Sequence, residues 1–195
     1  MHELTASWRR ADEPVAAHHL AQALLPPGAY ARCRGVAQQA ARTARAARLA
    51  RDRRARLLSA AWLHDLGRAA GPGVGRLDAA RALRRAGHEP LARIVAHAAG
   101  AALAAELAGR PPVAAEFPPP AGADAGLLTL LDIAVVTTGP DGAPTSPARL
   151  LRAIADGGPT DPRRRVLVAV VARLADDPVA RALVEHLAPR AAAGS

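Results

Sequence analysis

The sequence has no lysine, no asparagine and few aromatic residues, with two Trp and one each of Phe and Tyr among 195 residues. All 26 basic residues are therefore Arg, a preference typical of GC-rich genomes. Arg without interleaved aromatic side chains offers no stacking platform for single-stranded nucleic acid. We therefore assign most of the net charge of +9 to solvated helix faces and do not expect nucleic-acid binding, although this charge suits a small anionic ligand.

Cysteine pairs and long apolar runs are also missing. The single Cys33 excludes an intrachain disulfide, which favours a reducing, cytoplasmic location. No apolar stretch is long enough to cross a bilayer, and the first ten residues have no apolar core of the kind that a signal peptide carries. A membrane protein is therefore not expected, and the oligomeric state stays open.

Strand signals are nearly absent, whereas Ala, Leu and Val supply most of a composition that is 50% hydrophobic. Small apolar residues favour helices that pack closely, so we predict an all-α fold, a compact helical bundle in one domain over residues 1–195. Loops are expected at 71–73 and over 111–122, and a frayed tail from 190. Helices are expected over residues 14–25, 29–51, 53–66, 78–86, 90–107, 123–136, 147–155, 161–175 and 178–187.

The most informative motif is the adjacent pair His64-Asp65, which follows the apolar run Ala61-Trp62-Leu63. Neighbouring side chains lie about 100° apart on a helix, so these two converge only where the helix faces a cavity. Gly67 is expected to end the helix. In a functional interpretation Asp65 orients His64 as a catalytic general acid or base. The alternative is a buried, hydrogen-bonded pair that serves packing alone.

The motifs around this pair resemble those of the HD-domain superfamily, helical metal-dependent phosphohydrolases, and small bacterial members above all. The resemblance implies an HD-type bundle in which helices over 161–187 pack on the matching region. It also implies a pocket where an early His, the His-Asp pair and a late Asp hold one or two metal ions. The matching segments within residues 30–154 are Tyr30–Ala37, Ala61–Gly67, Arg76–Arg81, Gly87–His97, Glu116–Pro118 and Thr137–Gly142.

The chain departs from the ligand set that this resemblance implies. Arg32 stands at the position of the early His, and Val135 at that of the late Asp. Gly75 replaces a frequent His, and His97-Ala98-Ala99 stands where relatives often have His-His-Ser. Open metal sites usually keep three protein ligands, so no metal cofactor is expected.

A divalent metal is the alternative, and His64, Asp65 and His97 would then hold it. Asp132 lies three residues before Val135, near the same helix face, where it could support a displaced metal site or pair with an Arg. His97 is either a pocket residue or a hydrogen-bonded core residue.

The same resemblance gives a pocket lined by Arg32, His97, Asp132 and Trp62 around the catalytic candidates His64 and Asp65. Arg32 is expected to point towards Asp65, because a guanidinium there would balance a buried carboxylate. In the alternative, Arg32 turns outward and Cys33 or an alanine faces the pocket.

Three functions follow from these motifs. The first is a divergent HD-type protein without metal-dependent phosphohydrolase activity, whose pocket binds a small anionic ligand or supports metal-free acid/base catalysis. The second is a phosphohydrolase that acts on a nucleotide or phosphomonoester through an altered mononuclear site. The third is a structural or regulatory module whose pocket has collapsed.

Overall fold

The computed structural model describes residues 2–69, 77–154 and 161–189, and within these ranges it contains helices and no β-strand. The all-α prediction is confirmed. The elements are α1 (His2–Arg9), α2 (Pro14–Leu24), α3 (Pro27–Ala46), α4 (Arg51–Leu63), α5 (Leu66–Ala69), α6 (Leu77–Arg85), α7 (Glu89–His97), the 3₁₀ turn η1 (Ala98–Gly100), α8 (Ala101–Leu107), α9 (Val113–Glu116), α10 (Ala123–Val136), α11 (Pro147–Ala153), α12 (Pro162–Asp176) and α13 (Pro178–Leu187).

Proline and short polar side chains begin many of these helices. α2, α3, α7, α11, α12 and α13 carry Pro in their first two positions, where the missing amide hydrogen costs nothing. The side chains of Ser146, Asp161 and Asp177 accept hydrogen bonds from the first turns of α11, α12 and α13. These starts agree with the sequence prediction because capping depends on local residues.

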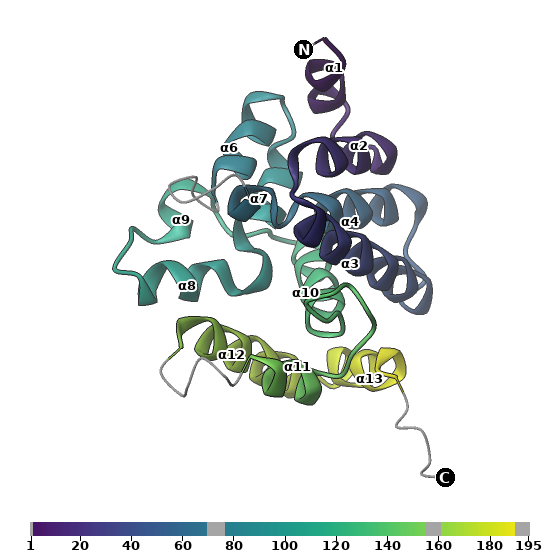
Figure 1. Cartoon of the computed structure of the whole chain (residues 1–195), viewed down its shortest axis with the longest axis vertical. Coiled ribbons are helices and arrows are strands. Elements are labelled where there is room, and N and C mark those ends of the chain that lie inside the picture. Colours follow the sequence, from purple (N-terminus) through teal and green to yellow (C-terminus); the bar gives the residue numbers. More distant parts are fainter. Residues whose placement is uncertain (1, 70–76, 155–160, 190–195) are drawn as a thin grey trace.

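Helix α10 lies at the centre of the molecule (Figure 1). It contacts α3, α4 and α7 on one side and α12 and α13 on the other, so the last two helices do pack on the preceding chain. The residues of its second half are almost all buried, including Leu131, Ile133 and Val136. A helix that is apolar all round belongs in a core. Among the described helices, none combines the length and apolar character needed to cross a membrane.

The predicted helix over 29–51 is wrong only at its end, over residues 47–50, because α3 ends at Ala46 and α4 begins at Arg51. Arg48 adopts the left-handed conformation, with a φ of 51°. The amides of Arg48 and Leu49 donate to the carbonyls of Arg45 and Ala44, a helix ending that usually carries glycine. Because arginine stands in that place, no local signal in the sequence predicts this helix end.

The predicted helix over 90–107 is also interrupted. α7 ends at His97, and α8 begins only at Ala101. Ala99 has φ 51° and ψ 38°, and Gly100 has a φ of 70°. A β-carbon on Gly100 would lie 2.6 Å from a methyl group of Val166 in α12, so this break also allows α12 to approach closely.

Smaller differences concern the ends of other elements. α1 was not predicted, and α9 lies inside the connection expected to be irregular over 111–122. His64 and Asp65 come after the last residue of α4, and Gly67 belongs to α5 and does not end the helix. Gly75, the predicted loop at 71–73 and the predicted tail from 190 lie outside the described residues.

Candidate functional site

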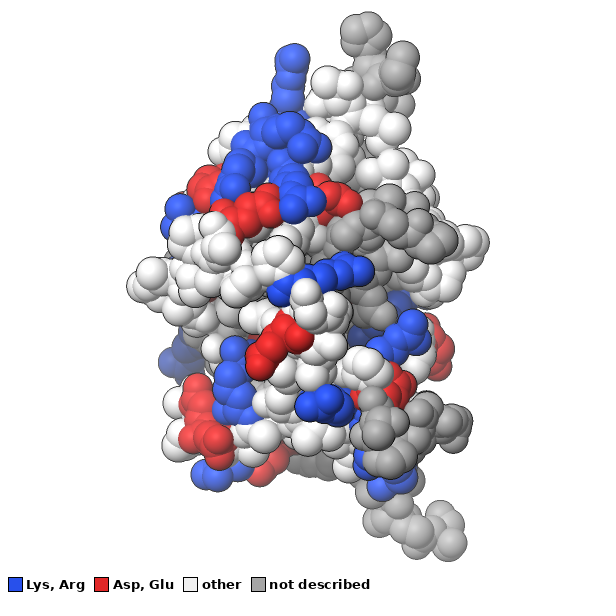
Figure 2. Space-filling view, turned by 90° about the vertical axis from the view of Figure 1, so that its left-hand side faces the viewer, with Lys and Arg blue, Asp and Glu red and all other residues white. Residues whose placement is uncertain are grey.

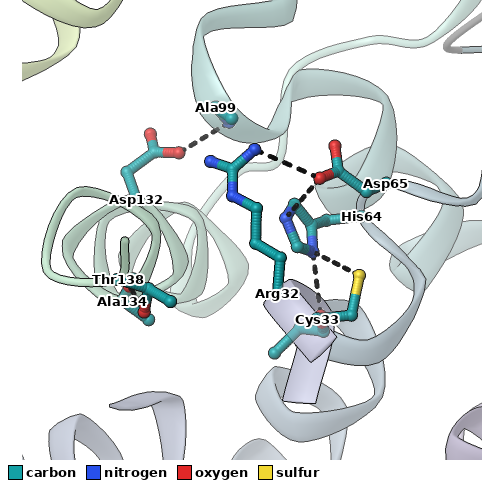
Figure 3. Close-up of polar contacts among 9 residues, drawn as sticks. Arg32, Cys33, His64, Asp65, Ala99, Asp132, Ala134 and Thr138 are labelled. Carbon is teal, nitrogen blue, oxygen red and sulfur yellow. Dashed lines mark hydrogen bonds and ion pairs between the residues drawn. The ribbon is translucent and has the colours of Figure 1, made fainter. Parts of the chain in front are cut away.

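His64 and Asp65 follow α4 directly and face Arg32 and Cys33 of α3 (Figure 3). Both are buried, with 6% of each residue exposed. Fully buried alanines on α4 let this helix pack closely on its neighbours, so the pair enters the interior. The structure therefore brings together two of the predicted pocket residues and the predicted catalytic pair.

A backbone carbonyl orients the His64 ring. Its Nδ1–H donates to the carbonyl oxygen of Ala61 at 2.8 Å, and the Cys33 Sγ lies 4.0 Å from the same nitrogen. The ring is thereby turned so that Nε2 lies 3.5 Å from the Asp65 Oδ2. This arrangement fixes which nitrogen faces the carboxylate, a prerequisite for acid/base chemistry and for metal binding alike.

The predicted contact between Arg32 and Asp65 is present. Arg32 Nη1 donates to Asp65 Oδ2 at 3.4 Å, and 23% of the Arg32 side chain is exposed against 8% for Asp65. The guanidinium therefore places a positive charge beside the buried carboxylate. The alternative in which Arg32 turns outward is not what the structure has.

Cys33, His64 and Asp65 form a group that the sequence prediction did not assemble. One ligand atom from each lies within 4.8 Å of the others, and all three residues are buried. Thiolate, imidazole and carboxylate are suitable ligands for a transition metal. However, Arg32 already places a positive charge on the same carboxylate, and two like charges repel strongly in a buried site. These residues do not fit a divalent ion while Arg32 holds Asp65.

Asp132 on α10 is fully buried and bonds to the turn that separates α7 from α8. Its Oδ1 accepts a hydrogen bond from the Ala99 amide at 2.8 Å, and its Oδ2 accepts one from Arg173 of α12. Two roles for Asp132 were compatible with the sequence, support of a displaced metal site and pairing with an arginine. The structure shows the pairing with an arginine. The sequence offered no signal for Arg173, since its partner lies 41 residues earlier on another helix.

His97 and Trp62, the other predicted pocket residues, have partners elsewhere. The His97 Nε2–H donates to the Phe117 carbonyl at 2.8 Å, and His97 is not in the group formed by Cys33, His64 and Asp65. The interpretation of His97 as a hydrogen-bonded packing residue agrees with this contact.

Trp62 belongs to an aromatic cluster between α2, α3 and α4. Its ring centroid lies 4.5 Å from that of His18 and 5.9 Å from that of Tyr30, and a hydrogen bond of 2.8 Å joins His18 to the Tyr30 hydroxyl. Burial lowers the pKa of the His18 imidazole, and the neighbouring His19 lowers it further. This cluster holds three helices together, and Trp62 does not line the cavity beside Arg32.

That cavity has a volume of about 420 Å³ and lies between α10, α11 and α12. Of the four residues Arg32, Cys33, His64 and Asp65, only Arg32 lines this cavity. A second arginine, Arg163, comes from the first turn of α12. The rest of the wall is mostly apolar and includes Val135, Val136, Leu150, Val166, Leu167 and Val170. The sequence had placed Arg32 and Val135 near a predicted pocket, and the spacing of Val166 and Val170, one helical turn apart in α12, could have indicated a further part of this wall.

Comparisons of this chain with known protein families, with curated proteins and with solved structures found no match. The HD resemblance therefore depends on the sequence motifs alone. The arrangement of the site has to be interpreted from its own chemistry.

Proposed function

We propose that this chain is a divergent HD-type domain that binds a small anionic ligand with an apolar body and has no metal-dependent phosphohydrolase activity. The observation that carries the proposal is the cavity, which Arg32 and Arg163 line together with mostly apolar residues. Pockets for small molecules are typically apolar with a few polar groups that fix orientation. Arginine is well suited to a carboxylate or phosphate head group.

The geometry supports ligand binding over metal-free catalysis. Only 1% of the His64 side chain is exposed, and neither His64 nor Asp65 lines the cavity. A ligand bound there would contact Arg32 and not the imidazole, whereas a general base must lie within hydrogen-bond reach of its substrate. The cavity beside Val135 also argues against a fully collapsed pocket.

Octanoate is a suitable probe, and octan-1-ol is its uncharged counterpart. Isothermal titration calorimetry measures the affinity of the chain for each. We expect octanoate to bind more tightly, because only the carboxylate pairs with Arg32. The Arg32→Gln variant should bind octanoate about tenfold to a hundredfold more weakly, which corresponds to the loss of one charge-assisted hydrogen bond. Its affinity for octan-1-ol should be unchanged. Val135→Phe, which fills the cavity, should abolish the binding of both.

Arg149→Gln is the matched control. It removes one positive charge from an exposed position on α11 that does not line the cavity, so octanoate affinity should stay unchanged. Equal affinity for octanoate and octan-1-ol, or no response to Val135→Phe, would refute this site.

A second candidate is a metal-dependent phosphohydrolase with an altered site, and the proximity of Cys33, His64 and Asp65 favours it. Elemental analysis of protein purified without chelator tests it. We expect less than about 0.1 transition-metal ion per chain, because Arg32 competes for the carboxylate. The variant with both Arg32→His and Val135→Asp restores the ligand types that the HD resemblance implies and should gain a measurable divalent site. About one ion per unmodified chain, lost in His64→Ala, would instead support the hydrolase.

A further inference from the structure

The positive charge of this chain is concentrated in one stretch. Residues 34–56 contain eight Arg and one Asp, a net charge of +7 out of +9 for the whole chain. A GC-rich genome accounts for the choice of Arg over Lys, but it does not account for this concentration. The location of the charge therefore requires its own explanation.

The structure displays this stretch on the second half of α3, the turn after it and the start of α4. Six of its arginines are exposed, and we call the five from position 42 onward, Arg42, Arg45, Arg48, Arg51 and Arg54, the α3–α4 basic surface. Within the part of the chain that the structure describes, none of the five forms an ion pair with a carboxylate. The surface therefore presents uncompensated charge to solvent.

Two of the remaining arginines of this region have internal roles. Arg56 forms a 2.7 Å ion pair with Asp124, and Arg53 donates to the Ala123 carbonyl, so both hold α4 against the start of α10. The stretch 34–56 itself contains one acidic residue, the exposed Asp52. One carboxylate cannot neutralise five guanidinium groups.

A hollow of about 300 Å³ lies at the edge of this surface, where α13 meets α3. Arg42 and Arg45 line it together with His186. A concave site lined by two arginines, with no carboxylate in its described wall, is suited to a phosphate group.

Several arginines elsewhere in the described chain are arranged differently. On the face shown in Figure 2, basic and acidic side chains lie side by side. Arg81 pairs with Asp78 and Glu116, and Arg84 and Arg93 both bond to Glu89. The hydrogen bonds from Arg84 and Arg93 lower the pKa of Glu89 to about 2, so this carboxylate stays ionised and compensates the charge of the two arginines. The α3–α4 basic surface has no such compensation.

The composition of the whole chain gave no reason to expect nucleic-acid binding, but the concentration of arginines on one surface changes that expectation. We propose that the α3–α4 basic surface binds the backbone phosphates of duplex nucleic acid without reading the base sequence. Arginine clusters neutralise phosphates and release counterions, which supplies most of the free energy of non-specific binding. The five arginines have no aromatic residue among them on which unpaired bases could stack, so a duplex is favoured over a single strand. This inference is independent of the small-ligand cavity.

The surface also lacks what a membrane-binding helix needs. The exposed large hydrophobic residues of the described chain are Val15, Leu24, Val168 and Val179, and none belongs to α3 or α4. Interfacial helices insert an apolar face beside their basic residues. The charge pattern therefore fits a solvated polyanion better than a lipid surface.

Fluorescence anisotropy of a labelled DNA duplex of about 20 base pairs, titrated with the full chain between about 50 and 200 mM NaCl, tests the proposal. We expect a Kd of about 10⁻⁴ to 10⁻⁶ M that rises steeply with salt. The triple variant Arg45→Gln, Arg51→Gln, Arg54→Gln should bind at least about tenfold more weakly and lower the log–log salt slope by about 2 to 3.

The matched control is the triple variant Arg149→Gln, Arg152→Gln, Arg165→Gln. It removes the same charge from exposed positions on α11 and α12, and its affinity and salt slope should match those of the unmodified chain. Gln has nearly the helix propensity of Arg, so circular dichroism should show both variants folded. Should the first triple variant unfold, Arg45→Gln alone should still lower the slope by about 1.

Equal losses in both triple variants would mean that overall charge and not this surface is responsible, which overturns the proposal. Binding of single-stranded DNA as tight as that of the duplex would overturn it as well. The proposal would also be overturned if the chain bound phosphatidylserine vesicles and did not bind the duplex. That result would indicate that the surface binds a membrane.

Discussion

Replacing Gly35 with alanine is expected to lower the free energy of unfolding by about 3 kcal/mol. A β-carbon at this position would lie 2.1 Å from the carbonyl oxygen of Gly142, in the turn after α10. The obstacle is backbone, which cannot rotate away, so the whole turn would have to withdraw from α3. Gly142 itself has a φ of 84°, and a β-carbon there would lie 2.3 Å from the Ala31 carbonyl oxygen. Chemical denaturation followed by circular dichroism measures the loss.

Gly126→Ala is the control, because this glycine also lies inside a helix. An added β-carbon there would meet only the end of Arg53, at 3.6 Å, which is an ordinary contact. This variant should be neutral or more stable by about 0.5 to 1 kcal/mol, the difference in helix propensity. If Gly35→Ala proved as stable as Gly126→Ala, the close approach of α3 and the turn would be wrong.

Asp132→Ala is expected to destabilise the fold by about 2 to 4 kcal/mol. The change removes the hydrogen-bond acceptor of the Ala99 amide and the ion-pair partner of Arg173. Ala99 is in the left-handed conformation, which costs free energy for any residue with a β-carbon, so the loss of this hydrogen bond leaves that cost without compensation. Since 55% of the Arg173 side chain is exposed, water solvates much of the charge left behind. Asp132→Asn keeps an acceptor oxygen and should lose about half as much.

Asp124→Ala provides the comparison on the same helix. Its ion pair with Arg56 is partly solvated, so the loss should stay below about 1 kcal/mol. Hydrogen exchange at the backbone amides of residues 98–100 adds an independent measurement, since Asp132→Ala should accelerate exchange there and Asp124→Ala should not. Similar losses in the two variants would show that Asp132 does not hold the break between α7 and α8.

Part of the candidate site could be predicted from the sequence. The adjacency of His64 and Asp65 and the arginine at position 32 indicated a buried carboxylate with a cationic partner, and the structure has that contact. Cys33 was considered only as an alternative to Arg32, because its distance from His64 depends on how α3 and α4 pack. His97 was placed in the pocket through the HD resemblance, whereas its hydrogen bond goes to Phe117.

The sequence by itself determined that the chain is helical and where most helices begin, because proline, capping residues and apolar periodicity act within a few residues. Only the tertiary structure decided where α3 stops and where α7 breaks. Arg48 and Ala99 adopt left-handed conformations that their residue types do not favour. At Ala99 the hydrogen bond to Asp132 comes from a residue 33 positions away. Which helices meet likewise decides whether a cavity opens beside Arg32, because its walls come from elements far apart in the chain.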